Sequence, residues 1–271
     1  MKKTFLAVFT AIVALYGSEN ADIFTKYEGT LRIAGGTAHI PTMKAVAKEI
    51  EKSNPRIKVA IAGGGSGVGI KKVGEGLVDI GNAGRAVTDK EKSRYGLVPF
   101  KWAIDAIAVA VNPSNPVSNL EREKVIDIFA GRIKNWKEVG GKDAPIDIYT
   151  RDSASGTRKV FWKKMLSKGE ITPSANFVNS NGAMKRAIAN DPNAIGFVSA
   201  GFLDDSVKGI SVDGIYPDKK HILSGEYGCK RGLYSITKGQ PEGLKKAFID
   251  YMLSPHVQHD IVAKKGFIPV R

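Results

Sequence analysis

Short apolar runs alternate with amphipathic stretches along most of the chain. Thr30–Gly36 and Arg56–Gly65 are largely apolar segments that end in glycines, as short strands running into turns do. Between them, Pro41–Pro55 carries its apolar residues on one helical face, and its leading proline suits a first helical turn. Ala103–Asn112 is almost continuously apolar, which is typical of a strand buried on both faces. Strands that alternate with helices predict an α/β protein with mostly parallel sheets.

The same alternation resumes beyond a connector that contains two prolines, Asn112–Leu120. Further along, Gly209–Pro217 looks like a return crossing. The chain length suffices for two modest lobes with separate cores. We therefore predict a discontinuous first lobe (22–112 plus 217–271) and a second lobe (113–216), joined by a hinge of two crossings.

The beginning of the chain has the pattern of a secretory signal peptide. Lys2 and Lys3 precede an apolar run, Phe5–Tyr16, that is too short to span a membrane and is followed by small and polar residues. No cysteine follows this run, so we expect no lipid anchor. The sequence thus predicts a signal peptide over residues 1–21 and a periplasmic protein.

Composition narrows the choice of ligand. The formal net charge is +14 and the isoelectric point about 9.7, which favours anionic ligands. Aromatic residues are sparse and no basic helix or stacking platform stands out, so nucleic acid is not the expected partner. The single cysteine, Cys229, excludes an intrachain disulfide, and the histidines are scattered, so we expect neither a metal nor a cofactor.

Three glycine-rich turns share one chemistry: Gly35–Pro41, Gly63–Gly69 and Arg151–Thr157. Each follows a predicted strand and opens a predicted helix, where unpaired N–H groups and the helix dipole favour an anion. In open α/β sheets, ligands bind beyond these carboxyl ends of the strands. One such turn alone is more often a simple helix cap, but three indicate an anion site. Their hydroxyls belong to Thr37, Ser66, Ser155 and Thr157.

The familiar catalytic motifs are not met. A phosphate-binding P-loop fails because Ile70 separates Gly69 from Lys71 and no hydroxyl residue follows the lysine. A nucleophile elbow fails at Ser66, because Val68 stands where its last glycine belongs. No paired carboxylates suggest acid–base chemistry. We expect a binding protein and not an enzyme.

The order of these motifs resembles the phosphate-binding proteins that serve phosphate ABC importers. The resemblance runs from about Thr30 to the C-terminus, and its most specific part is Arg-x-x-x-Ser-Gly-Thr. It implies a type 2 periplasmic-binding-protein fold whose two lobes close on inorganic phosphate, and an ABC permease as partner. We expect a monomer. The matching segments read "GGTAHIP", "GGGSGVGIKKVGEGLVDIGNAGRAVTD", "RDSASGTRKVF" and "AIGFVSAGFLD".

The resemblance also implies which residues contact phosphate. The first turn would offer a hydroxyl and backbone N–H groups, the second a serine, and the third an arginine as the charged ligand. By position these are Thr37 and Ala38, then Ser66 with Gly67, then Arg151, Ser155, Gly156 and Thr157.

One position departs from the family pattern. Gly84 precedes Arg85 where family members carry an aspartate, or commonly a serine before the arginine. A carboxylate accepts the proton that phosphate keeps near neutral pH and repels sulfate, which has none. With glycine here, Asp79 or Asp152 must supply the acceptor, or sulfate is rejected less well. Arg85 itself contacts the ligand, shapes the turn or contributes a long-range electrostatic field.

Three other functions stay open at this point. The chain could be a receptor for another tetrahedral oxyanion, which the glycine at position 84 would favour. It could be an exported phosphatase that uses Ser66 or Ser155. It could also be a basic adhesion protein that binds polyanions at its surface.

Overall fold

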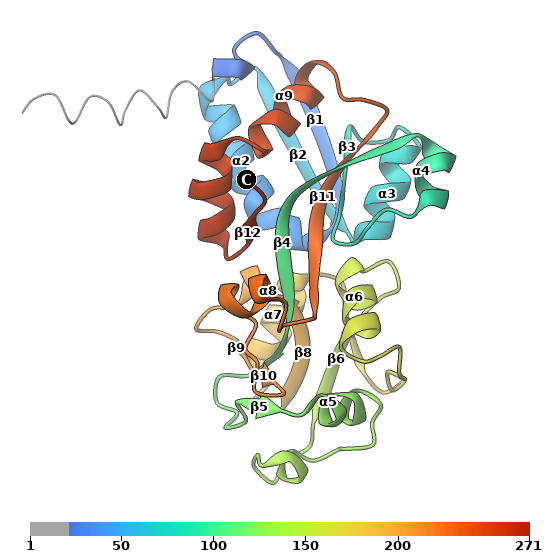
Figure 1. Ribbon diagram of the computed structural model, residues 1–271, viewed down its shortest axis with the longest axis vertical. Helices are drawn as coiled ribbons and strands as arrows, with labels where there is room; N and C mark the ends of the chain where they lie inside the picture. Colours follow the sequence, from blue (N-terminus) through green and yellow to red (C-terminus); the bar gives the residue numbers. More distant parts are fainter. Residues whose placement is uncertain (1–21) are drawn as a thin grey trace, which may run out of the picture.

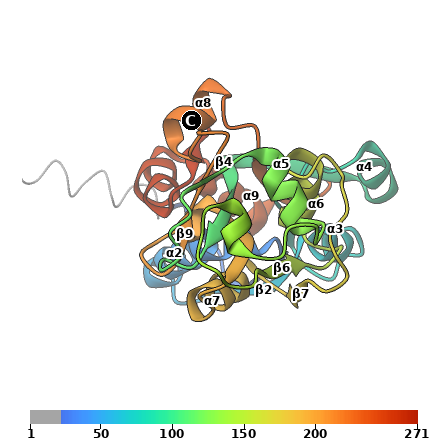
Figure 2. The ribbon, with the colours of Figure 1, turned by 90° about the horizontal axis from the view of Figure 1, so that it is seen from below.

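The computed structural model describes residues 22–271, which form two lobes, one above the other in Figure 1. Helices cover the sheet in both lobes, and seen from below α6 and α7 lie on opposite sides of β6 (Figure 2). The upper lobe contains β1 (Gly29–Gly35), α2 (Ile40–Ser53), β2 (Ile57–Gly64), α3 (Ser66–Gly74), β3 (Ile80–Ala83), α4 (Asp89–Tyr95), α9 (Gly243–Met252) and β12 (Ile268–Pro269). The lower lobe contains β5 (Asn119–Leu120), α5 (Arg122–Phe129), β6 (Asp147–Arg151), α6 (Gly156–Lys164), β7 (Asn176–Val178), α7 (Asn181–Asn190), β8 (Ala194–Ser199), β9 (Lys208–Gly209), β10 (Ser211–Val212) and α8 (Lys219–Ser224).

Two long strands connect the lobes. β4 (Leu97–Val111) leads down and β11 (Lys230–Lys238) leads back, and they pair antiparallel along most of their length. The strand order β2-β1-β3-β11-β4-β8-β6-β7 therefore continues from one lobe into the other. Gly209–Pro217 is not the return crossing: it includes β10, which pairs with β5 inside the lower lobe. The chain returns to the upper lobe in β11.

The predicted α/β character is confirmed within each lobe. β1, β2 and β3 are parallel in the upper lobe, as are β6, β7 and β8 in the lower lobe. The antiparallel pairs involve mainly the two crossing strands. β4 begins at Leu97, six residues before the apolar run that starts at Ala103. Its first residues are mostly partly exposed, so they lack the continuous apolar pattern of its later, buried residues.

Each lobe has its own core. In the lower lobe, the rings of Phe161 and Phe197 stack with centroids 4.3 Å apart, and Phe129 packs edge-on against the first. Ile222 and Tyr227 join this core, so α8 belongs with the lower lobe although the sequence assigned its residues to the first. The upper core gathers around α2, α9 and the first half of β4. Separate cores allow each lobe to act as a unit.

None of the helices within residues 22–271 is both long enough and apolar enough to cross a membrane. Over the same residues, no group of three or more histidine, cysteine, aspartate or glutamate side chains could hold a metal ion. The predicted signal peptide, residues 1–21, lies outside the described residues.

A buried histidine stands at the entrance to α2. His39 is fully buried, and its ring meets that of Trp102 edge-to-face with centroids 5.5 Å apart. Burial, with a further contribution from the positive charge of Arg231, lowers the pKa of His39 to about 3. The imidazole is therefore neutral in the folded protein across the physiological pH range.

We expect this histidine to make the fold acid-sensitive. In the unfolded chain His39 takes up a proton below its ordinary pKa of about 6.5, whereas in the folded chain it does so only near 3. The folded state thus loses stability as the pH falls from 6.5 towards 3, by about 1.4 kcal/mol per unit. Urea unfolding at several pH values, for the wild type and His39→Leu, measures this. On acidification the wild type should lose stability relative to His39→Leu, and parallel curves would contradict the assignment.

Candidate functional site

A small pocket lies where the two lobes meet. Its cavity volume is only about 10 Å³, so it has no room for an organic ligand of drug size. Both lobes and the crossing strand β11 contribute to it. Its lining residues are Gly36, Thr37, Ala38, His39, Gly65, Ser66, Gly84, Arg151, Ser155, Gly156, Thr157 and Arg231.

The three glycine-rich turns supply most of this lining. β1 runs into the turn that carries Thr37, and β2 runs into Ser66, the first residue of α3. In the lower lobe β6 ends at Arg151, and Ser155 caps α6 by accepting from the N–H of Arg158. The close approach requires glycine at position 65, because φ there is +87° and a Cβ would come within 2.7 Å of the Ala154 carbonyl oxygen. The structure thus brings helix N-termini of both lobes to one point.

Arg151 provides a buried positive charge, and two of its nitrogens have no hydrogen-bond partner among the described residues. Its side chain is almost fully buried, and its Nη2 donates to the carbonyl oxygen of Asn179 at 3.1 Å. Nε and Nη1 have no hydrogen-bond partner among the described residues. Burial lowers the pKa of Arg151 to about 10, against the opposing effect of Asp152, so the group remains charged at neutral pH. A buried cation with free donors is costly unless an anion meets it.

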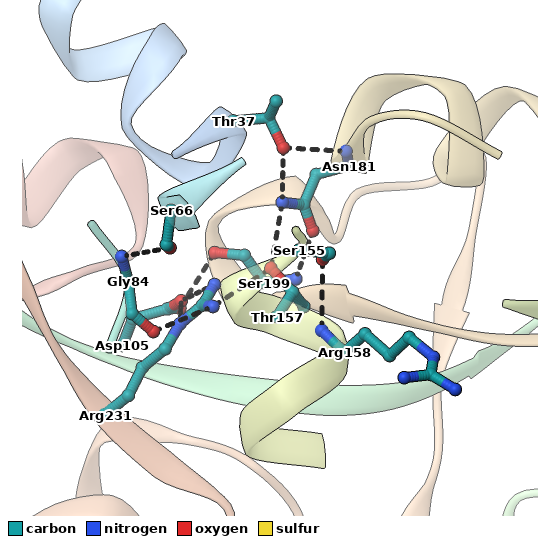
Figure 3. A network of polar contacts seen from close by, with 10 residues as sticks. All are labelled: Thr37, Ser66, Gly84, Asp105, Ser155, Thr157, Arg158, Asn181, Ser199 and Arg231. Atoms are coloured by element: carbon teal, nitrogen blue, oxygen red, sulfur yellow. Dashed lines mark hydrogen bonds and ion pairs between the residues drawn. The ribbon is translucent and has the colours of Figure 1, made fainter. Parts of the chain in front are cut away.

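A second arginine, Arg231, reaches the pocket from β11. Its Nε and Nη2 lie 2.8 Å from one carboxylate oxygen of Asp105, and its Nη1 donates to the Thr157 hydroxyl at 2.9 Å (Figure 3). Burial raises the pKa of Asp105, which the adjacent guanidinium offsets in part. The sequence did not predict this pair. The available signal was a single acid in the apolar run of β4 and, among the three cations of β11, Arg231 at a position that alternates in phase with the buried Leu233.

The glycine at position 84 makes room for this arginine. A Cβ there would lie 2.8 Å from Nη1 of Arg231, and the Gly84 carbonyl oxygen accepts from that atom at 3.3 Å. The two proposed substitute carboxylates are engaged elsewhere: Asp79 accepts from the N–H of Arg32, and Asp152 accepts from the N–H of Ser155. No carboxylate is among the residues 22–271 that line the pocket.

Two predicted site residues lie outside the lining. Gly67 instead donates its N–H to the carbonyl oxygen of Ala154 at 3.1 Å, a direct bond between the lobes. Arg85 turns to Glu91 and binds both of its carboxylate oxygens, at 2.8 and 2.7 Å. The hydrogen bond from Arg85 lowers the pKa of Glu91 to about 2. Of the roles considered for Arg85, this geometry is that of a residue that holds the turn before α4.

Asn181 is a further residue that sequence reasoning missed. It is fully buried at the start of α7, and it donates to the hydroxyls of Thr37 in the upper lobe and Thr157 in the lower lobe (Figure 3). Ser180 caps this helix just as Ser155 caps α6. The segment "NSNGA" is thus a fourth turn of the same kind, and its serine, asparagine and glycine before a helical pattern were the available signal.

Cations also line a groove beside the pocket. This groove shares Arg231 with the pocket, so the two adjoin at that residue. A concentration of positive charge at a cleft raises the local concentration of anions and speeds their association. Its other cations are Arg85, Lys159, Lys163, Lys164 and Lys230.

Comparison with known proteins agrees with this geometry. The model of the PBP superfamily domain matches residues 25–256. The phosphate-binding protein PstS of Bacillus subtilis (strain 168) is 37% identical over 98% of this chain and 92% of its own length. The chain belongs to the PstS family of phosphate-binding proteins. The PstS of Borreliella burgdorferi is 31% identical over the whole of both chains.

Solved structures of this family share the fold. A putative phosphate ABC transporter substrate-binding protein with bound phosphate, from Clostridium perfringens, superposes with a TM-score of 0.83 at 34% identity and covers 90% of this chain and 100% of its own. An ABC-type phosphate transport receptor from Vibrio cholerae gives a TM-score of 0.70 at 32% identity, over 88% and 99%. The resemblance and the two-lobed type 2 fold predicted from the sequence are confirmed.

Gly156 and Gly67 both lie where the lobes touch, so alanine substitutions at these two positions test the contact. A Cβ at Gly156 would lie 2.0 Å from the Ser66 hydroxyl oxygen, whereas one at Gly67 would meet nothing closer than 3.6 Å. We expect Gly156→Ala to keep the lobes apart and to weaken anion binding at least 10-fold, as for the loss of one or two hydrogen bonds. Gly67→Ala, at the same contact, should bind as the wild type does. Calorimetric titration with phosphate compares the two, and equal affinities would contradict the closed geometry.

Proposed function

We propose that the chain is a receptor that captures inorganic phosphate between its lobes and delivers it to an ABC permease. The observation that carries this proposal is the buried guanidinium of Arg151, with two unpaired donor atoms, in a pocket where helix N-termini of both lobes converge. The names of the PstS relatives and the phosphate-bound structure from Clostridium perfringens support the choice of ligand.

The donors in the pocket suffice for tight binding. Each hydrogen bond to a charged group contributes about 1.5–3 kcal/mol, and micromolar affinity requires about 8 kcal/mol. Arg151 and a few hydroxyl and backbone donors reach that value after ordering costs. We assign the contacts to Thr37, Ala38, Ser66, Arg151, Ser155, Gly156 and Thr157, with Gly84 and Arg231 completing the wall.

The same geometry argues against a phosphatase. The hydroxyl oxygens of Ser66 and Ser155 accept from backbone N–H groups at 2.9 and 3.1 Å, and no described carboxylate or imidazole is hydrogen-bonded to either. His39 lines the pocket, but its pKa of about 3 makes it a weak base at neutral pH. We infer that the pocket binds its ligand without transforming it.

The family and the N-terminal sequence support a proposal for where the receptor acts. We propose that the chain is exported by a signal peptide over residues 1–21 without a lipid anchor, acts in the periplasm as a monomer, and meets its permease there. Its high net charge and the basic groove beside the pocket would speed phosphate capture.

Replacing the pocket arginine should abolish binding without unfolding the protein. Arg151→Met keeps the apolar stem and removes the charge, so the phosphate Kd should rise at least 100-fold, as for the loss of charge-assisted bonds. Arg85→Met is the matched control, because Arg85 pairs with Glu91 outside the lining, and its Kd should stay close to that of the wild type. Calorimetry with phosphate, together with circular dichroism, reports both. An unchanged Kd in Arg151→Met would remove this residue from the site.

Sulfate should compete with phosphate in this receptor. No carboxylate is among the described lining residues, so nothing repels a fully deprotonated oxyanion. We expect the Kd for sulfate to lie within about 100-fold of that for phosphate, about 2.7 kcal/mol. Competition calorimetry with phosphate, sulfate and arsenate measures this. A much larger preference for phosphate would mean that another group accepts a hydrogen bond from its proton. A preference for sulfate would favour the alternative hypothesis, a receptor for another tetrahedral oxyanion.

A further inference from the structure

The four hydroxyls of the pocket already accept hydrogen bonds from the protein. A hydroxyl oxygen has one proton to donate and two lone pairs with which to accept. The Ser66 oxygen accepts from the N–H of Gly84, and the Ser155 oxygen accepts from the N–H of Arg158. Each serine thus retains one free lone pair and its proton.

The two threonines retain only their protons. The Thr37 oxygen accepts from the backbone N–H of Asn181 at 3.2 Å and from its Nδ2 at 3.1 Å. The Thr157 oxygen accepts from Nη1 of Arg231 at 2.9 Å and from the same Nδ2 at 3.3 Å. With both lone pairs occupied, each threonine can only donate to a ligand.

Asn181 is common to both threonines, and its own orientation is fixed. Its Oδ1 accepts from the backbone N–H of Ser199 at 3.0 Å, a group that can only donate. The amide nitrogen must therefore face the two hydroxyls (Figure 3). Asn181 does not line the pocket itself, so any effect on the ligand passes through Thr37 and Thr157.

We propose that Asn181 is a positioning residue that commits Thr37 and Thr157 to donating, so that the pocket selects the most highly charged form of its oxyanion. This inference rests on the proposed phosphate binding. A phosphate dianion has one proton to place, and the monoanion has two. Among the four hydroxyls, only those of Ser66 and Ser155 keep a lone pair for such protons, one each. The monoanion would therefore turn both serines into acceptors, whereas the dianion turns only one and leaves the other to donate.

The pH dependence of binding then belongs mainly to the ligand. Phosphate affinity in the wild type should rise with pH through the second ionisation of phosphate, close to neutrality. The charged and titratable side chains around the two threonines are His39 before α2, Arg151 on β6, and Arg231 on β11 with Asp105 on β4. Sulfate keeps its charge over this range, so sulfate titrations at the same pH values report any change in the protein itself.

The decisive test is a double-mutant cycle read by calorimetry with phosphate. Asn181→Ala should raise the Kd about 30-fold, the value of two neutral hydrogen bonds. In a Thr37→Val, Thr157→Val background the same change should cost less than about 3-fold, because the groups through which Asn181 acts are gone. Asn181→Ala should also weaken the pH dependence and raise the preference for phosphate over sulfate, because freed lone pairs can accept the phosphate proton.

A matched control separates positioning from a purely structural role. Asn112 is another buried asparagine of the lower lobe, and its Nδ2 donates to the carbonyl oxygens of Ile188 and Ala189 at the far end of α7. Asn112→Ala should lower Tm as Asn181→Ala does but leave the phosphate Kd and its pH dependence unchanged.

The outcomes distinguish this inference from the function on which it rests. A wild type that binds no phosphate overturns the proposed function and this inference with it. If the wild type binds phosphate, the inference alone is overturned by an unchanged Kd in Asn181→Ala. It is equally overturned if the 30-fold loss persists in the valine background, or if Asn112→Ala reproduces the changed pH profile.

Discussion

The ion pair between Asp105 and Arg231 is the contact on which the arrangement of the pocket depends. The two residues are direct partners in the pairing of β4 with β11, the strands that connect the lobes. Both are buried, and the carboxylate also accepts from the Ser199 hydroxyl at 2.8 Å. Because the guanidinium then reaches Gly84 in the upper lobe and Thr157 in the lower, one pair fixes the pocket wall relative to both. Breaking such a buried pair leaves an uncompensated charge in the core.

This pair also sets the charge of the site. Arg231 is balanced by Asp105, so Arg151 supplies the net positive charge that faces the ligand. Around it stand hydroxyls and the N–H groups of helix N-termini, which add donors without adding a competing negative charge. Recognition therefore depends on the number and geometry of the donors, and the carboxylate that the family resemblance led us to expect has no counterpart in the described lining.

The features predicted correctly from the sequence depend on local chemistry, and the features missed depend on contacts between distant parts of the chain. The strand-to-helix turns at Thr37, Ser66 and Ser155 follow from glycine, hydroxyl and helix pattern, and the structure places all three in one pocket. Arg231 and Asn181 come from elements far along the chain, and their roles appear only once β11 pairs with β4 and α7 begins beside α6. The late return of the chain was missed for the same reason, since Gly209–Pro217 and β11 both read as short apolar segments.

A residue that neighbours a lining residue in the sequence does not always face the pocket. Gly67 and Arg85 each follow a lining residue, yet the first donates to Ala154 across the lobes and the second turns outward to Glu91. Gly67 lies in the first turn of α3 and Arg85 in the loop before α4, and in both places successive residues face different surroundings. Which side chain points inward is decided by the tertiary contacts available on each side, here a carboxylate on α4 for Arg85.

The direct bonds between the lobes bear on how such a receptor closes. The N–H of Gly67 donates to Ala154, and Asn181 donates to Thr37, so part of the closed arrangement is held by protein alone. A ligand shifts an opening equilibrium only by its differential affinity for the two states. Bonds that the protein makes to itself on closing reduce the shift that the anion must provide, so a small ligand with few contacts can still hold the lobes together.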